Sequence, residues 1–242
     1  MRIGSAEAVV SVIIPCLNEE AAIGSLVREL LTLGVDEAVV VDGRSSDRTV
    51  ESARAAGAKV VIETMRGYGR ACAAGIAAAR GDAAIVAFMD GDGSDSPSGL
   101  LDVIGPVLRG EADFAIGSRL RGRREPGSLS LQQAIAGQLA GVLIRLAYGA
   151  RFTDMSPCRA ITRSALGSIG MQEKTYGWNL EMQMRVAAAR MRVIEIPVSC
   201  RQRRGGVSKV SGNLAAVVPA AVVLLRTFLR LFLTLRRAQG FK

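Results

Sequence analysis

Histidine is absent from this 242-residue chain, and the absence excludes several kinds of chemistry. Without histidine there can be no Ser-His-Asp triad, no histidine general base and no histidine ligand for zinc. Aromatic residues are also scarce, at 4%, which disfavours a protein that stacks the bases of single-stranded nucleic acid. Any chemistry that the chain performs must therefore use carboxylates, cationic side chains or backbone groups.

Cysteine is sparse as well. The four cysteines lie far apart in the sequence and show no metal-ligand spacing; they are Cys16, Cys72, Cys158 and Cys200. We interpret them as reduced, mostly structural thiols of a cytosolic protein, with disulfide pairing left open. No basic segment followed by an apolar stretch opens the chain, so no signal peptide is expected.

Acidic residues are outnumbered by basic ones, 22 against 31, which gives a net charge of +9 and a pI near 10.1. This surplus indicates anionic partners, such as phosphates, nucleic acid or an acidic membrane surface. Arginines that bind the phosphates of a small ligand would explain the same charge. We therefore expect no nucleic-acid partner. Apolar residues make up 49% of the chain, enough for one domain with a modest extension.

Apolar runs and amphipathic segments alternate along the first half of the chain. Five runs predict buried strands, at residues 9–15, 37–41, 59–62, 83–89 and 114–116. The segments after the first four have helical character, and the connections are short. This alternation predicts an α/β fold with a mostly parallel sheet, in which ligands bind beyond the carboxyl ends of the strands.

The second half is expected to add two helices and one strand. Residues 129–148 form a long apolar segment, and a further helix begins at residue 177. Residues 193–198 predict a strand, which Pro197 marks as an edge strand. Basic, glycine-containing loops at 117–127 and 201–209 are either solvated surfaces or phosphate grips, and the forked arginine side chain favours the second interpretation.

Two aspartates follow the apolar run at 83–89. Asp90 and Asp92 are separated by one glycine and form a small anionic pocket at a strand end. Such oxygen ligands suit a hard divalent cation, which also holds substrate phosphates. The alternative is a plain acidic turn, since Asp and Gly favour turns for local reasons. Polar residues at two other strand ends, 15–19 and 42–43, converge on the same edge and favour the binding site.

Gly67 and Gly69 lie in the loop after the third expected strand. A dinucleotide fingerprint is not expected, because Cys72 stands where the third glycine is required and the loop does not follow the first strand. A glycine-flexed loop with Arg66 and Arg70 near a diphosphate is one interpretation. An ordinary strand–helix turn is the other.

The C-terminal segment, residues 210–242, has a different pattern. Residues 210–225 carry no charge but fall short of the roughly 20 apolar residues that a membrane-spanning helix requires. From Leu224 onward the pattern is amphipathic. Arginines lie on one side (Arg226, Arg230 and Arg237) and apolar residues on the other (Leu224, Phe228, Leu231 and Leu235). We expect a membrane-associating helix; packing on the domain or on a second subunit is the alternative.

Taken together, these motifs resemble family 2 glycosyltransferases of the GT-A fold, and within them the dolichol-phosphate mannose synthase-like, polyprenyl-phosphate branch. The resemblance covers nearly the whole chain, and the order and spacing of its segments make it specific. The segments are residues 12–19, 41–43, 66–69, 89–92, 117–119, 158–160, 177–181 and 206–209. The resemblance implies a glycosyltransferase domain over residues 1–209.

The resemblance also implies roles for individual residues. Those that would line the nucleotide pocket are Pro15, Leu17, Glu19 and Asp42, with Arg66 and Gly67 near the diphosphate. Asp90 and Asp92 would hold Mg²⁺ or Mn²⁺, and Ser94 stands where relatives can offer a third ligand. A loop that closes on phosphates would contain Arg203, Ser208 and Lys209, while Arg119 would contact an acceptor phosphate. The expected catalytic residues are Asp92, Arg119 and Glu181.

The acceptor is less clearly specified. Hydroxyl-using relatives often place a Glu-Asp pair, containing their base, at the start of the helix near 177, where only Glu181 is acidic here. A phosphate acceptor needs cations but no base. We therefore expect an inverting enzyme that moves a hexose from a UDP-glucose or GDP-mannose type donor to a polyprenyl phosphate or another lipid. It would lie at the inner face of the membrane, with a homo-oligomer left open.

The sequence leaves two alternatives open. One is a hydroxyl acceptor with Glu181 or Asp154 as the base. The other is a non-catalytic relative that binds nucleotide sugars. Residues 154–159 are also shorter than the Asp-x-Thr-Ser-Gly-Phe-Arg segment common in relatives, which indicates a different acceptor site.

Overall fold

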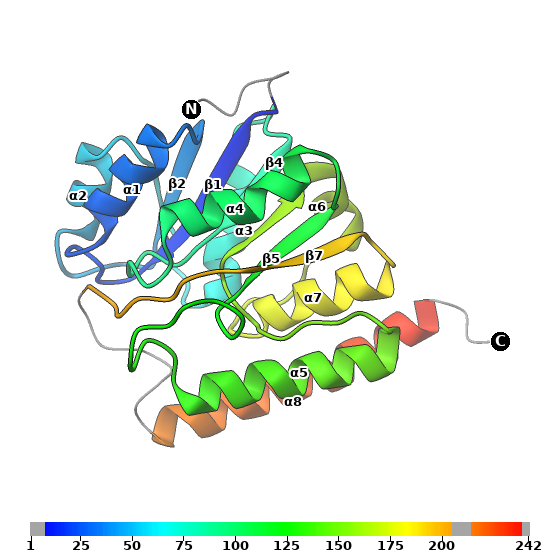
Figure 1. The fold of residues 1–242 in the computed structure, drawn as a ribbon. Helices are drawn as coiled ribbons and strands as arrows, with labels where there is room; N and C mark the ends of the chain where they lie inside the picture. Colours follow the sequence, from blue (N-terminus) through cyan, green and yellow to red (C-terminus); the bar gives the residue numbers. More distant parts are fainter. Residues whose placement is uncertain (1–7, 205–213, 239–242) are drawn as a thin grey trace.

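One mixed sheet forms the centre of the protein, which a computed structural model describes over residues 8–204 and 214–238 (Figure 1). The strands are β1 (Val10–Cys16), β2 (Glu37–Asp42), β3 (Lys59–Ile62), β4 (Ile85–Phe88), β5 (Phe114–Ser118), β6 (Arg159–Thr162) and β7 (Val193–Pro197). Their order is β3-β2-β1-β4-β6-β5-β7. All neighbouring pairs are parallel except those of β6, which is antiparallel to β4 and β5. The predicted α/β fold with a mostly parallel sheet is confirmed.

The sequence missed one strand, β6. Its four residues open with Arg159, a charged residue, and offer no clear alternation of apolar and polar residues. Pairing with buried neighbours on both sides, rather than an apolar pattern of its own, makes this segment a strand. The expected edge strand is confirmed, because β7 pairs with β5 alone at the end of the sheet.

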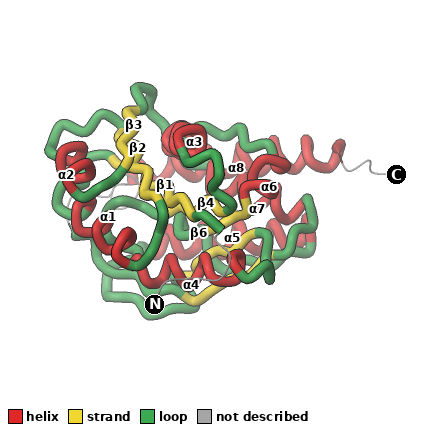
Figure 2. Tube along the Cα trace, turned by 90° about the horizontal axis from the view of Figure 1, so that it is seen from above, coloured by secondary structure: helices red, strands yellow, loops and turns green. Residues whose placement is uncertain are grey.

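Helices cover both faces of the sheet. They are α1 (Ile23–Thr32), α2 (Thr49–Ala55), α3 (Tyr68–Ala78), α4 (Pro97–Leu108), α5 (Leu131–Tyr148), α6 (Arg163–Ile169), α7 (Trp178–Ala188) and α8 (Leu214–Ala238). Figure 2 shows α1 and α4 on one side of the sheet and α3 on the other. Because side chains alternate along a strand, Val12 and Ile14 of β1 join the core beneath α1 and α4, and Ile13 joins the core beneath α3 and α7.

Close packing of α3 on β1 depends on Gly75. An added Cβ at this buried glycine would overlap Ile13 Cγ2. We expect Gly75→Ala to lower the free energy of unfolding by about 1–3 kcal/mol, because overpacking a dense core forces its neighbours to move. Urea denaturation measures this directly.

Gly167→Ala is the matched control on α6. Its Cβ would meet nothing within 4 Å. Alanine loses less backbone entropy than glycine in a helix, so this variant should be neutral or more stable by up to about 1 kcal/mol. Equal effects of the two substitutions would contradict the packing argument.

The two longest helices, α5 and α8, form an outer layer along the lower edge of the molecule in Figure 1. Each contacts α7, and they contact one another. The apolar side of α8 predicted to face a membrane instead packs on the domain, with Leu231 buried and the other members partly buried beside it (Leu224, Phe228 and Leu235). That prediction is wrong in its choice of face, because α7 offers this stripe a protein partner.

Polar contacts fix α8 in place. Glu173 Oε2 accepts hydrogen bonds from Thr227 Oγ1 at 3.2 Å and from Arg230 Nη2 at 2.7 Å. Within the described ranges, no helix is long and apolar enough to cross a membrane.

Candidate active site

The first part of the site lies where β1 and β2 end. These strands are paired so that Cys16 is opposite Asp42, and Gly43 N–H donates to Cys16 O at 2.8 Å. Asp42 is buried and accepts hydrogen bonds from the backbone N–H of Ser45, at 2.9 Å, and from the Ser45 hydroxyl. The structure thus brings Asp42 beside residues 15–19, the set predicted to line one pocket.

Asp90 and Asp92 follow β4, the strand that lies next to β1 in the sheet. Asp90 Oδ1 accepts a hydrogen bond from the Tyr68 hydroxyl at 3.1 Å. Asp92 Oδ1 accepts one from Ser94 N–H at 2.8 Å. Burial, together with the charges of Asp92 and Asp95, raises the pKa of Asp90 to about 7. Asp90 thus combines a desolvated position with two like charges nearby, both of which disfavour its ionised form.

Asp95 adds a third carboxylate, which is not among the predicted site residues. It is buried, and neither carboxylate oxygen has a hydrogen-bond partner among the described residues. Burial raises its pKa to about 6; Arg119 opposes the rise, and the charges of Asp92 and Asp154 add to it. Asp95 thus adds negative charge near Asp92, and Arg119 offsets part of it.

The carboxylate oxygens of Asp90 and Asp92 suit a hard divalent ion as ligands. Within the described part of the chain, no group of three or more His, Cys, Asp or Glu side chains could hold a metal by itself. Asp90 and Asp92 would therefore share such an ion with phosphate oxygens and water, as is usual for Mg²⁺. Oxygen donors without thiolate or imidazole agree with this class of metal.

Arg203 lies across the two halves of the site. Its Nη2 is 2.7 Å from Glu19 Oε1, and its Nε is 3.3 Å from Asp92 Oδ2. The segment after β7 holds it there, since Arg201 N–H donates to Ser94 O and Arg204 N–H donates to Asp92 O. The predicted phosphate-closing residues Ser208 and Lys209 lie outside the described residues.

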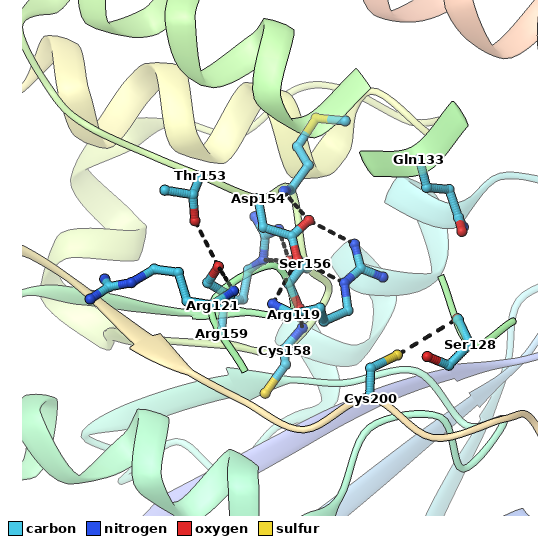
Figure 3. Close-up of polar contacts among 12 residues, drawn as sticks. Arg119, Arg121, Ser128, Gln133, Thr153, Asp154, Ser156, Cys158, Arg159 and Cys200 are labelled. Atoms are coloured by element: carbon cyan, nitrogen blue, oxygen red, sulfur yellow. Dashed lines mark hydrogen bonds and ion pairs between the residues drawn. The ribbon is translucent and has the colours of Figure 1, made fainter. Parts of the chain in front are cut away.

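Arg119, at the end of β5, is paired with Asp154 (Figure 3). Its Nε and Nη2 donate to the two carboxylate oxygens at 2.8 and 2.9 Å, and its backbone N–H donates to Asp154 Oδ2 at 2.9 Å. Asp154 engages Nε and Nη2 of Arg119, so a phosphate contact by the rest of this guanidinium stays a prediction. Burial alone would raise the pKa of Asp154, but the contacts with Arg119 hold it below its ordinary value.

Glu181 does not face the site. The side chain is fully buried, and its Oε1 accepts from Arg185 Nε at 2.9 Å. Its Oε2 accepts from the backbone N–H groups of Gln172 and Glu173 at 3.0 and 2.6 Å. The prediction of a catalytic Glu181 is therefore corrected to a structural role, because these three donors already satisfy the carboxylate.

The glycines at 67 and 69 have a packing explanation. A Cβ at either would overlap backbone atoms of residues 173–174, and Gly69 N–H donates to Thr175 O at 3.2 Å. Arg66 is exposed. These contacts favour the interpretation as a strand–helix turn over one in which Gly67 flexes around a diphosphate.

Two residues behind the aspartates were not predicted. Tyr68 reaches Asp90, and Arg159 is fully buried, with its Nε and Nη1 donating to Ser156 O and Asn179 O, both at 3.1 Å. Burial lowers the pKa of Arg159 to about 10. Both residues belong to recognised motifs, but no local pattern indicates contacts made across 20 residues or more of sequence.

Comparisons with known proteins identify relatives of this chain. A glycosyltransferase of Mycobacterium tuberculosis is 36% identical over 215 residues, covering 87% of this chain and 94% of its own length. The dolichyl-phosphate hexose transferase of Haloferax volcanii is 33% identical over 199 residues, covering 81% of this chain and 84% of its own.

Solved structures show the same fold. Glucosyl-3-phosphoglycerate synthase from M. tuberculosis, in complex with Mn²⁺, uridine diphosphate and glucosyl-3-phosphoglycerate, superposes with a TM-score of 0.75 at 24% identity, covering 93% of this chain and 80% of the other. The family described as Glycosyl transferase family 2 matches residues 11–170. With its GT-A fold and its paired aspartates, the chain belongs to glycosyltransferase family 2.

Proposed function

We propose that this glycosyltransferase moves a hexose from a UDP-glucose or GDP-mannose type donor to a polyprenyl phosphate or another lipid, at the inner face of the membrane. The dolichyl-phosphate hexose transferase relative supports the acceptor class. Complexes of the structural neighbour with Mn²⁺ and uridine diphosphate support the donor class and the metal.

The donor end of the site is built from three strand ends. In this proposal, residues 15–19 and Asp42 hold the base and ribose, and Asp90 and Asp92 hold Mg²⁺ or Mn²⁺. A divalent ion bound there neutralises the charge that develops on the departing nucleoside diphosphate. Arg203, already 3.3 Å from Asp92, supplies a second positive charge toward the same phosphates.

One observation carries the choice of acceptor. Both carboxylates considered as bases are already engaged, Glu181 with Arg185 and Asp154 with Arg119. The contacts with Arg119 hold the pKa of Asp154 below its ordinary value, and Glu181 is fully buried with both carboxylate oxygens already accepting hydrogen bonds. Neither side chain is therefore placed to accept a proton from a substrate. A phosphate monoester is already anionic at neutral pH and needs no base. The geometry thus favours a phosphate nucleophile over a hydroxyl.

Release of nucleoside diphosphate tests the proposal. The purified chain is incubated with Mn²⁺ and each of several nucleotide sugars, with and without a short polyprenyl phosphate. We expect one donor to be turned over at least about tenfold faster with the lipid phosphate. Donor binding with turnover only on a soluble phosphorylated hydroxyl compound, such as phosphoglyceric acid, would overturn the lipid acceptor while leaving the donor site in place.

A further inference from the structure

Exposed apolar side chains are concentrated on the two helices of the α5/α8 layer. Of the twelve exposed large apolar side chains among the described residues, nine belong to these two helices. They are Leu131, Ile135, Leu139, Val142 and Leu146 on α5, and Val222, Leu225, Leu229 and Leu233 on α8, each between 48% and 78% exposed. Surfaces of this kind on a globular protein mark an interaction site.

Each stripe follows the period of a helix. On α5 the exposed residues recur at intervals of four, four, three and four, so they share an arc of about 80°. The buried residues of α5 lie on the opposite side, where Gly141 allows the backbone of Phe152 to approach closely. On α8 the stripe lies away from Leu231, which packs on the domain. Both stripes therefore face away from the protein.

The charges on these helices have one sign. Neither helix contains aspartate or glutamate, and together they contain five arginines: Arg145, Arg226, Arg230, Arg236 and Arg237. Arg145 and Arg226 are exposed beside the apolar stripes. A long side chain in this position keeps its stem on apolar surface while its guanidinium reaches an anionic group.

We propose that the α5/α8 surface docks on an anionic lipid bilayer. Apolar side chains inserted below the headgroups, flanked by arginines at the level of the phosphates, form the arrangement by which interfacial helices bind membranes. A second copy of the chain fits less well. A two-fold contact would bring the same arginines together without an acidic partner from either helix.

The surface also has a defined relation to the site. In Figure 1 both helices begin on the side of the molecule where β1 ends. Ser128, just before α5, accepts a hydrogen bond from the Cys200 thiol, and a Cβ at Gly137 of α5 would lie 3.3 Å from Asp154 Oδ1. A bilayer against this surface would place lipid headgroups beside the Arg119–Asp154 pair. This orientation, unlike the surface itself, rests on the proposed lipid acceptor.

Vesicle flotation tests docking without any use of activity. The full chain is mixed with vesicles of phosphatidylcholine, with or without phosphatidylglycerol. We expect binding that requires phosphatidylglycerol and weakens at high salt. The double variant Leu139→Glu with Leu229→Glu should bind at least about tenfold more weakly, because two charges would enter the apolar layer. Ile62→Glu, which alters an exposed apolar residue of β3, is the matched control and should bind like the unmodified chain.

Two results would overturn the proposal: no binding of the unmodified chain to anionic vesicles, or unchanged binding of the double variant. A concentration-dependent dimer in sedimentation that the double variant abolishes, without vesicle binding, would assign the surface to a second copy instead. Leu146→Asn is a milder change at the most exposed position of the α5 stripe, so it should fold even if the double variant does not. We expect it to weaken binding about threefold or more. Failure of lipid-dependent turnover with vesicle binding intact would refute the acceptor and leave the docking surface standing.

Discussion

Asp92→Ala should reduce metal-dependent sugar transfer at least about a thousandfold while the protein stays folded, since removal of one preorganised group that stabilises transition-state charge already costs 10²–10³. Asp92 is nearly fully buried at the end of β4, and its second oxygen lies 3.3 Å from Arg203. The substitution removes one of the two carboxylates assigned to the ion. Release of nucleoside diphosphate measures the effect on activity, and titration calorimetry with Mn²⁺ measures the effect on binding.

Asp102→Ala is the matched control for this variant. Asp102 is an exposed residue within α4, and its loss should change neither Mn²⁺ affinity nor turnover by more than about twofold. Full transfer by Asp92→Ala in the presence of metal would refute the assignment of Asp92. A folded variant that binds Mn²⁺ normally but fails to turn over would leave Asp92 a role in the reaction and remove it from the ion.

The strand ends were predictable from sequence because they depend on local pattern. Apolar runs interrupted by Asp42 or Asp90 locate both a buried strand and the point where it stops, and parallel strands bring such points to one edge. The strands β1, β2 and β4 are adjacent in the sheet, which places these residues together. The fold class, the edge strand and the convergence of residues 15–19 with the aspartates followed from this pattern.

The contacts that assign roles were not predictable in the same way. Arg203 meets Glu19 across 184 residues of sequence, and Arg119 meets Asp154 across 35. The sequence around an arginine in a basic loop does not show whether its guanidinium is free to bind a phosphate or is paired with a carboxylate. Which of the two applies is decided by the partner that the fold supplies, and the sequence on either side of the arginine does not contain it.

The same limit applies to helix faces. The periodicity of α8 gives an apolar stripe through Leu231 and another through Leu229, and both suit an interfacial helix. Only the presence of α7 decides that Leu231 is the packed residue and Leu229 the exposed one. The exposed stripe on α5 was not predicted, because a long apolar helix is expected to be buried.

Glu181→Gln separates the two roles considered for Glu181. We expect the free energy of unfolding to fall by about 2–4 kcal/mol, because the substitution leaves the Arg185 guanidinium, only slightly exposed, without its counter-charge. Turnover per folded molecule should stay within about twofold, because the side chain is fully buried and its three donors all belong to the scaffold. Urea denaturation and diphosphate release, the latter corrected for the folded fraction, measure the two quantities.

Glu111→Gln is the matched control on the surface. Its partner Arg109 and the glutamate are both well exposed, so the same substitution there should leave stability unchanged within the error of urea denaturation. A general base contributes typically 10²–10⁴-fold to the rate. If Glu181→Gln kept its stability and lost activity on that scale with donor binding intact, Glu181 would be the base and the acceptor a hydroxyl. We expect the opposite result, in which stability falls and turnover per folded molecule is kept. No carboxylate at the start of α7 would then act as a base, and a phosphate acceptor is the class of acceptor that needs none.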